Sequence, residues 1–301
     1  MQATLKRLEP YLRLMRLDRP VGSLLLLWPT LAALWIAAEG VPSIELILIF
    51  TLGTFVMRSA GCVVNDMADR ELDLLVQRTQ SRPLASGELR LGQALWVFAG
   101  LCSLGLMLIL FLNAASRWFA LGGLAILTLY PFMKRWTYLP QVVLGAAFSW
   151  GIVMAFTAIT GHVPPEGWLL FVASLLWIVA YDTMYAMVDR DDDLKIGIKS
   201  TAILFGQADR LMVGVLQVSA LLAFGMLGEQ LEFGLSYQAG LFAIGGLFVY
   251  QQVLIRNRER AGCFRAFANN TWVGFGLFAS VIAELTLAPM LASLIATDAP
   301  S

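Results

Sequence analysis

The chain has 301 residues, of which 58% are hydrophobic and 14% charged, and its mean hydropathy is +0.73. A water-soluble domain of this length could not bury so much apolar surface, which excludes a soluble globular protein and indicates an integral membrane protein. The 21 basic and 21 acidic residues cancel, so the net charge gives no sign of a nucleic-acid partner.

Apolar segments long enough to cross a hydrocarbon core of ~30 Å, at about 20 residues each, occur nine times. They lie at 20–38, 44–64, 91–112, 117–133, 139–160, 168–188, 211–228, 235–255 and 271–293. Continuous apolar runs favour helices over the alternating strands of a barrel. We therefore expect an all-α polytopic membrane protein, one domain over residues 1–301, with nine transmembrane helices. The fourth segment is short, so eight helices remain an alternative.

Basic residues orient these helices. Five precede the first segment, and the others cluster after every even-numbered segment, whereas Arg117 is the only Lys or Arg in the odd-numbered connections. By the positive-inside rule, this distribution predicts a cytoplasmic N-terminus. With nine spans, the C-terminus would then lie outside.

Residues 1–19 form a distinct N-terminal segment. Leu5, Leu8, Leu12 and Met15 recur at helical spacing among basic residues, which predicts a short amphipathic helix lying in the membrane interface. A frayed basic tail that only sets the topology is the alternative. No small-residue cleavage site precedes the first span, so we expect no removable signal peptide.

Two acidic clusters follow the second and sixth segments. Carboxylates at the mouth of a membrane span are costly unless a cation or a water-filled cavity compensates them, so both clusters are functional candidates. The residues of the first cluster are spaced by four, as are Asp189 and Asp193, and this spacing places each set on one helical face. The candidate metal ligands are Asn65, Asp69, Asp73, Asp189 and Asp193.

Oxygen ligands of this kind, completed by water and substrate phosphates, suit Mg²⁺, and no His or Cys lies in either row. The lone histidine, His162, falls in an outer turn and is expected to be solvated. Cys62, Cys102 and Cys263 lack metal-ligand spacing and are expected to pack in apolar surroundings. The two clusters therefore predict two Mg²⁺ ions that face one phosphorylated substrate.

Cations are needed as well, because two Mg²⁺ ions would cancel four aspartates while a bound diphosphate adds roughly three negative charges. Any one of the nearby basic residues could instead be an ordinary topology-setting charge. Arg58 lies too deep in its span for that role, seven residues before Asn65. The candidate diphosphate ligands are Arg58, Arg78, Arg82, Lys195 and Lys199.

An anionic site beside a hydrophobic bundle indicates a substrate with a charged head and an apolar tail, and a polyprenyl diphosphate fits. Metal ions that neutralise the departing diphosphate would allow the allylic C–O bond to ionise. An electron-rich aromatic ring could then attack, provided that the cavity excludes water.

Four motifs together resemble the UbiA superfamily of intramembrane aromatic prenyltransferases. They are NDMADRELD at 65–73, RTQSRPLASG at 78–87, YPFMKR at 130–135 and YDTMYAMVDRDDDLKIGIKST at 181–201. The likeness begins at RLDRPVGSLLLLWP, residues 16–29, and weakens in the last three predicted helices.

The resemblance implies nine helices around a central cavity in the bacterial inner membrane, capped on the cytoplasmic side by catalytic loops at 65–90 and 189–210. It also implies Mg²⁺ bound by the five candidate ligands. The expected reaction transfers a polyprenyl group from polyprenyl diphosphate to the ring carbon ortho to the phenol of 4-hydroxybenzoate, in ubiquinone biosynthesis. Homogentisate, dihydroxynaphthoate and haem remain alternative acceptors.

The resemblance implies that Tyr130, Lys134 and Arg135 belong to the family's YxxxK-type segment, in which the arginine is associated with the aromatic acid. A guanidinium can bind a carboxylate with two hydrogen bonds, which makes Arg135 a suitable partner, although it could simply end a span. Asp182 could remove the phenol proton, pair with such an arginine, or orient Asp189.

Tyr130 and Tyr185 could stabilise the allyl cation through their ring faces or serve only in packing. Asp66, Asp191 and Asp192 lie off the ligand rows and are expected to cap helices or orient loops. The sequence indicates contact with membrane lipid and no obligate protein partner.

Two other classes of membrane protein use buried carboxylates. A transporter would place them near the bilayer midplane, whereas here they lie at span ends beside basic loops. Phosphatidyl-transferring enzymes would need a compact D-G-x-x-A-R run, which this chain lacks. We expect the tail groove to accept several prenyl lengths.

Overall fold

The computed structural model describes residues 2–287, and for residues 2–7 it describes the backbone only. Within 2–287 the chain is helical and contains no β-strand. The helices are α1 (Gln2–Leu14), α2 (Val21–Ala37), α3 (Ile44–Asp69), α4 (Leu91–Leu110), α5 (Ala114–Trp136), α6 (Pro140–Thr160), α7 (Pro165–Ile196), α8 (Thr201–Phe205), α9 (Asp209–Gln230), α10 (Leu235–Leu254) and α11 (Arg260–Ile282). Short 3₁₀ turns occur at Asp73–Leu75 (η1) and Gly206–Ala208 (η2), and a π-helical turn (η3) covers Ala283–Leu287.

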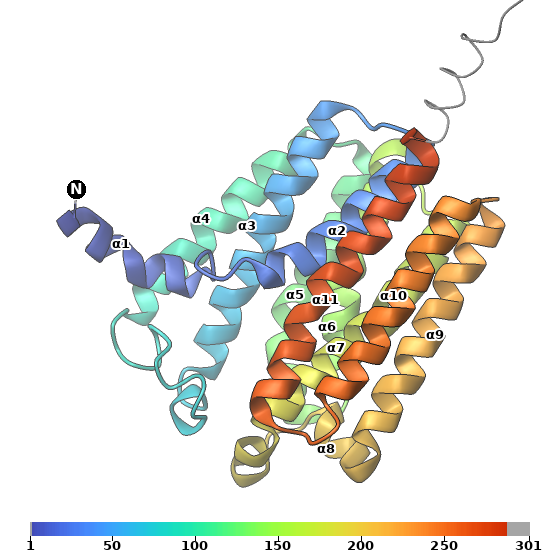
Figure 1. Ribbon diagram of the computed structural model, residues 1–301. Helices are drawn as coiled ribbons and strands as arrows, with labels where there is room; N and C mark the ends of the chain where they lie inside the picture. Colours follow the sequence, from blue (N-terminus) through green and yellow to red (C-terminus); the bar gives the residue numbers. More distant parts are fainter. Residues whose placement is uncertain (1, 288–301) are drawn as a thin grey trace, which may run out of the picture.

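The long helices α2–α7 and α9–α11 form one bundle (Figure 1). Each of them overlaps one of the nine predicted apolar segments. By length and composition, six helical stretches could cross a membrane, and α2 is a shorter apolar helix. Together they identify an integral membrane protein.

The last predicted segment has wrong bounds. Helix α11 begins at Arg260 rather than at 271, so Arg260 and Arg265 lie on the helix and not in the preceding connection. The polar first turns of α11 extend beyond its apolar stretch, which is why hydropathy alone misses them. Residues 288–293 of that segment lie outside the described part of the chain.

Helix α1 lies across the bundle direction rather than along it (Figure 1). Its residue Leu14 is fully buried in a small cluster with Val63 of α3 and Ala94 of α4. On the opposite side, Leu8 is 49% and Leu12 40% exposed. The predicted helix therefore forms, with one docked face and one exposed apolar face, and its position in the membrane interface stays a prediction. The side chain of Leu5 lies outside the described residues.

Helix α7 runs through the main core. Its residues Trp177 and Tyr181 are almost completely buried, and Trp177 Nε1 donates a hydrogen bond to Asn270 of α11, at 2.7 Å. Gly274 allows α11 to approach closely, since a Cβ there would lie 3.0 Å from atoms of both Trp177 and Trp28. This packing fixes α7 against α2 and α11.

The ends of α3 and α7 carry the two acidic clusters. Helix α7 has 32 residues, and Asp189 and Asp193 occupy its last two turns, as their spacing predicts. Helix α3 ends at Asp69, so the prediction that Asp73 continues the same helical row is wrong. The chain turns after Arg70, and Asp73 begins η1.

The two predicted catalytic loops, 65–90 and 189–210, are therefore partly helical. Residues 65–69 belong to α3, residues 189–196 belong to α7, and α8 follows at Thr201–Phe205. The longest non-helical connection in this region is the segment 70–90, apart from η1. We call residues 70–90 the acidic-cluster loop.

Candidate active site

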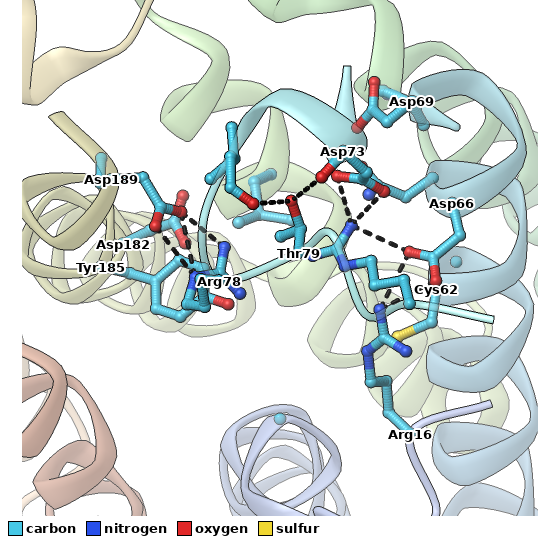
Figure 2. Close-up of a pocket in the computed structure, with 18 of the residues that line it drawn as sticks. Arg16, Cys62, Asp66, Asp69, Asp73, Arg78, Thr79, Asp182, Tyr185 and Asp189 are labelled. Atoms are coloured by element: carbon cyan, nitrogen blue, oxygen red, sulfur yellow. Dashed lines mark hydrogen bonds and ion pairs between the residues drawn. The ribbon is translucent and has the colours of Figure 1, made fainter. Parts of the chain in front are cut away.

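A cavity of about 680 Å³ lies where the ends of α3, α5 and α7 converge (Figure 2). Side chains from α2, α6, α11 and the acidic-cluster loop complete its wall. Both acidic clusters therefore face one space. The predicted site residues that line it are Arg58, Asn65, Asp69, Asp73, Arg78, Arg82, Tyr130, Lys134, Asp182, Tyr185, Asp189, Asp193 and Lys199.

Three of the aspartates are paired with cations from other elements. Arg78 Nε lies 3.0 Å from Asp189 Oδ1, and Arg82 Nη1 lies 2.9 Å from Asp73 Oδ2. Lys134 of α5 forms an ion pair with Asp69. Arg78 and Arg82, which the sequence assigns to a diphosphate, thus bind aspartates that it assigns to a metal.

The acidic-cluster loop joins the two clusters. Asp73 and Arg82 stay beside α3, while Arg78 extends to α7, where its guanidinium also lies 4.6 Å from the ring centroid of Tyr185. Thr79 Oγ1 donates a hydrogen bond to the carbonyl oxygen of Asp73 at 2.9 Å, which fixes the fold of the loop between these contacts.

Asp66 orients a loop, as predicted, and it does so from inside the site. Only 1% of its surface is exposed, and it accepts hydrogen bonds from Arg16 at 2.9 Å and Arg82 at 3.0 Å. From the sequence alone, Arg16 is only one of the five basic residues that precede the first span and set the topology. Its place in the motif RLDRP, residues 16–20, is the signal that could have identified it.

The carboxylates of the first acidic cluster are buried close to one another. Burial raises the pKa of Asp73, and the neighbouring carboxylates of Asp66 and Asp69 raise it further, while Arg82 lowers it; the net shift is upward. In addition, Asp69 Oδ1 is buried and accepts no hydrogen bond from the described residues. An oxygen-rich site with an unsatisfied carboxylate oxygen fits a hard divalent cation such as Mg²⁺.

The carboxylates of the two clusters are not arranged around a common point at which one metal ion could bind. Among the described residues, no group of three His, Cys, Asp or Glu side chains is close enough to hold one ion. The ion pairs keep the carboxylates apart, because Arg78, Arg82 and Lys134 each bind a different aspartate. Metal binding at these residues would require the cations to move away.

The deep end of the cavity is more apolar and contains Arg58. Its guanidinium lies 5.2 Å from the ring centroid of Phe148, and its Nε is buried without a hydrogen-bond partner among the described residues. Gly22 of α2 makes room for it, since a Cβ there would lie 2.8 Å from Nε. Arg58 is therefore a half-buried cation whose Nε has unused hydrogen-bonding capacity.

Tyr130, Tyr181, Asp182 and Tyr185 line the same cavity as Arg58. The Tyr181 hydroxyl is buried and has no hydrogen-bond partner in the described part of the chain. Tyr181 was not among the predicted site residues, although it begins the motif that contains Asp182. Aromatic faces and one half-buried carboxylate thus surround the space below the acidic clusters.

Two predicted site residues do not line the cavity. Arg135 is exposed, donates a hydrogen bond to the carbonyl oxygen of Ala68 at 2.6 Å and lies over the ring of Phe132. Lys195 is 75% exposed and lies 3.7 Å from Asp192. Successive positions on a helix point about 100° apart, so Lys134 faces the cavity while Arg135 faces outward.

The remaining predicted residues lie as follows. Lys199 lines the cavity, and its Nζ donates a hydrogen bond to the carbonyl oxygen of Trp136 at 3.3 Å. Asp192 pairs with Arg260 at 3.0 Å and so links α7 to α11, which agrees with an orienting role, whereas Asp191 is exposed. His162 is exposed, and Cys62 and Cys263 are buried free thiols.

A bundle of apolar helices with an acidic, cation-lined cavity at one end is typical of membrane enzymes that act on phosphorylated lipids. The chain belongs to the UbiA prenyltransferase family, because the sequence model of that family matches residues 26–282.

Similar curated proteins are named 4-hydroxybenzoate octaprenyltransferase. One from Alcanivorax borkumensis is 58% identical over 271 residues, which cover 90% of this chain and 93% of that protein. One from Ectopseudomonas mendocina is 54% identical over 285 residues, which cover 93% and 96%. One from Coxiella burnetii is 55% identical over 277 residues, which cover 92% and 96%.

Solved structures share the fold at lower identity. An apo UbiA homologue from Aeropyrum pernix superposes with a TM-score of 0.76 at 22% identity, covering 87% of this chain and 98% of that one. A UbiA homologue from Archaeoglobus fulgidus, solved with GPP and Mg²⁺, has a TM-score of 0.65 at 18% identity, covering 91% and 99%. The same homologue was also solved with Cd²⁺.

Proposed function

We propose that this chain is a Mg²⁺-dependent 4-hydroxybenzoate polyprenyltransferase of ubiquinone biosynthesis. It transfers a polyprenyl group from polyprenyl diphosphate to the ring carbon ortho to the phenol. The names of relatives at 54–58% identity support this assignment. The structural observation that carries it is the common cavity of the two acidic clusters, continuous with an apolar end that contains Arg58.

Asn65, Asp69 and Asp73 would hold one Mg²⁺, and Asp189 and Asp193 a second. When bound, the metal ions supply positive charge that stabilises the departing diphosphate. The unsatisfied Oδ1 of Asp69 supports this proposal, as does the oxygen-only donor set.

In this scheme the lining cations would have two sets of partners. Arg78, Arg82 and Lys134 pair with aspartates here, and with Mg²⁺ bound at those aspartates they would be available for other partners. Together with Lys199 they would then donate hydrogen bonds to the diphosphate from the loop and from α5. The same side chains would be present with and without substrate. Because the positive charge of two Mg²⁺ ions would offset the roughly three negative charges of the diphosphate, the net charge of the site would change little when both bind.

Arg58 is better placed than Arg135 to bind the benzoate carboxylate. It lies inside the cavity with an unpaired Nε, whereas Arg135 is exposed and donates to a backbone carbonyl. A carboxylate would supply the acceptor that the buried guanidinium lacks. This proposal assigns to Arg58 the role that the family resemblance associates with Arg135.

The acceptor ring would then lie near Asp182, Tyr130 and Tyr185, which line the same space. Asp182 is the carboxylate available to accept the phenol proton. The tyrosine ring faces can stabilise positive charge on the allyl group, and the enclosing helices limit access of water.

The proposed topology has nine transmembrane helices, a cytoplasmic N-terminus and an active site on the cytoplasmic face of the bacterial inner membrane. Basic residues around the cavity end of the bundle support this orientation. The position of the carboxylates at the ends of α3 and α7, rather than at mid-helix, favours a headgroup site over a transport pathway.

An acceptor competition assay tests the proposal. Purified protein receives Mg²⁺, a polyprenyl diphosphate and an equimolar mixture of 4-hydroxybenzoate, homogentisate and dihydroxynaphthoate, and the products are identified by mass spectrometry. The expected product is 3-polyprenyl-4-hydroxybenzoate. A prenyl group found mainly on another acceptor would refute the assignment.

A further inference from the structure

A second cavity, of about 690 Å³, lies against α9 and contains two arginines. It is lined by Gln207, Arg210, Leu211, Gly214, Val215, Val218, Ser219, Gln252 and Arg258, and shares no residue with the active-site cavity. We name it the α9–α10 groove, after the two neighbouring helices that carry most of it (Figure 1). We propose that it binds an anionic phospholipid, with the phosphate at Arg210 and an acyl chain along α9.

Arg210 is the observation that points to a ligand. Its side chain is half-buried, and its Nε has neither solvent contact nor a hydrogen-bond partner. No carboxylate within residues 2–287 forms an ion pair with it. Leaving a buried donor on a charged group unsatisfied is costly, so an acceptor from outside the chain would stabilise this arrangement.

The local charge selects an anionic ligand. Asp209 is fully buried and is shared by Arg190, at 3.0 Å, and Arg258, at 2.8 Å. Two arginines around one aspartate leave a net charge of +1, and the unpaired Arg210 brings the total to +2. A headgroup with a net negative charge complements this site better than a zwitterionic headgroup does.

The exposed apolar side chains in the wall of the groove favour a lipid over a free phosphate as its ligand. Leu211, Val215 and Val218 follow one another at helical spacing along α9 and are 68%, 48% and 58% exposed. They lead from the arginine end of the groove along the apolar helix. Gly214 lies between them, and its missing side chain leaves the groove open.

The position in the fold agrees with this ligand. Helix α9 begins at Asp209, only a short connection after the end of α7, so Arg210 lies at the end of the bundle that also carries Asp189 and Asp193. If that end faces the membrane surface, as proposed above, a phospholipid in the same leaflet would present its phosphate to Arg210. Its hydrocarbon chain would then follow Val215 and Val218.

Native mass spectrometry of the full-length protein in detergent tests the proposal. The protein is titrated with phosphatidylglycerol, with phosphatidylcholine, or with sn-glycerol 3-phosphate. We expect one phosphatidylglycerol to bind about tenfold more tightly than phosphatidylcholine, and no retained glycerol phosphate. Arg210→Gln should remove this preference, while Arg256→Gln should keep it, because Arg256 is exposed and does not line the groove.

Gly214→Leu provides a second variant that retains both arginines. A Cβ at Gly214 would lie 3.5 Å from Gln252 Nε2, which is ordinary contact, so the larger side chain should fill the groove without disturbing the helix. It should lower phosphatidylglycerol binding about as much as Arg210→Gln. Unchanged phosphatidylglycerol preference in Arg210→Gln, unchanged phosphatidylglycerol binding in Gly214→Leu, or equal loss in Arg256→Gln would overturn the proposal. Retention of glycerol phosphate at the lipid's affinity would overturn it too. None of these measurements depends on prenyl transfer.

Discussion

Arg78 and Asp189, which are 111 residues apart in the sequence, form an ion pair across the active-site cavity. Their closest contact is 2.5 Å, between Arg78 Nη2 and Asp189 Oδ2. The pair fastens the acidic-cluster loop, which begins at the first aspartate cluster, to the helix that carries the second. The two clusters thus face one cavity.

Removing one carboxylate from either cluster should abolish most activity. We expect Asp69→Asn and Asp189→Asn each to lower kcat about 10²-fold or more, because each removes a charge that holds a metal ion beside the leaving group. Steady-state prenyl transfer measures the effect. Asp191→Asn is the matched control, since Asp191 is exposed and lies outside the cavity. Near-native turnover in either cluster variant would count against two cooperating metal sites.

Arg58 and Arg135 give a direct comparison for the acceptor. We expect Arg58→Gln to raise KM for 4-hydroxybenzoate by about 10- to 100-fold, as loss of a charged hydrogen bond in a buried site would, with little change in KM for the diphosphate. Arg135→Gln should leave both constants within about twofold of the original values. If Arg135→Gln raised KM for 4-hydroxybenzoate and Arg58→Gln did not, Arg135 would be the residue that binds the benzoate carboxylate.

Arg78 should hold the acidic-cluster loop closed when no metal is bound. Arg78→Gln removes its ion pair with Asp189, so limited proteolysis within residues 70–90 should become several-fold faster in the presence of EDTA. Lys195→Gln serves as the control, because Lys195 is exposed and its Nζ lies 3.7 Å from its partner Asp192. Equal protection of the loop in both variants would show that the Arg78 contact does not close it.

Asp66 should contribute to stability rather than to chemistry. It is buried between Arg16 and Arg82, so Asp66→Asn should lower the free energy of unfolding by about 2–4 kcal/mol, because Arg16 loses its charged partner and Arg82 keeps only Asp73. Denaturation in detergent micelles measures this change. Glu71→Gln, at an exposed pair with Arg70, should change stability by less than about 1 kcal/mol.

Much of the fold could be predicted from the sequence, because membrane helices depend on long apolar runs. Each of the nine predicted segments overlaps a helix, and α1 forms where residues 1–19 suggested one. The errors occur where polar turns extend or interrupt a helix. Helix α11 begins before its apolar stretch, and α3 ends at Asp69 because the chain turns before Asp73.

The site was predictable where the residues are part of spaced motifs, and less so where long-range pairing decides. Residue spacing placed Asp189 and Asp193 correctly on one helix. It could not show that Arg16 reaches Asp66 from 50 residues away. Nor could it show that Lys134 faces the cavity while its neighbour Arg135 faces outward, because both are simply basic residues at the end of a span.

The shared diphosphate site is tested most directly by counting its metal ions. Mn²⁺ is added to the purified protein with an unreactive prenyl diphosphate analogue, and electron paramagnetic resonance follows the bound ions. We expect two Mn²⁺ ions per chain with spin coupling typical of a pair about 4 Å apart, and loss of the coupling in both Asp69→Asn and Asp189→Asn. A single bound ion, or two uncoupled ions, would contradict a common site for the two acidic clusters.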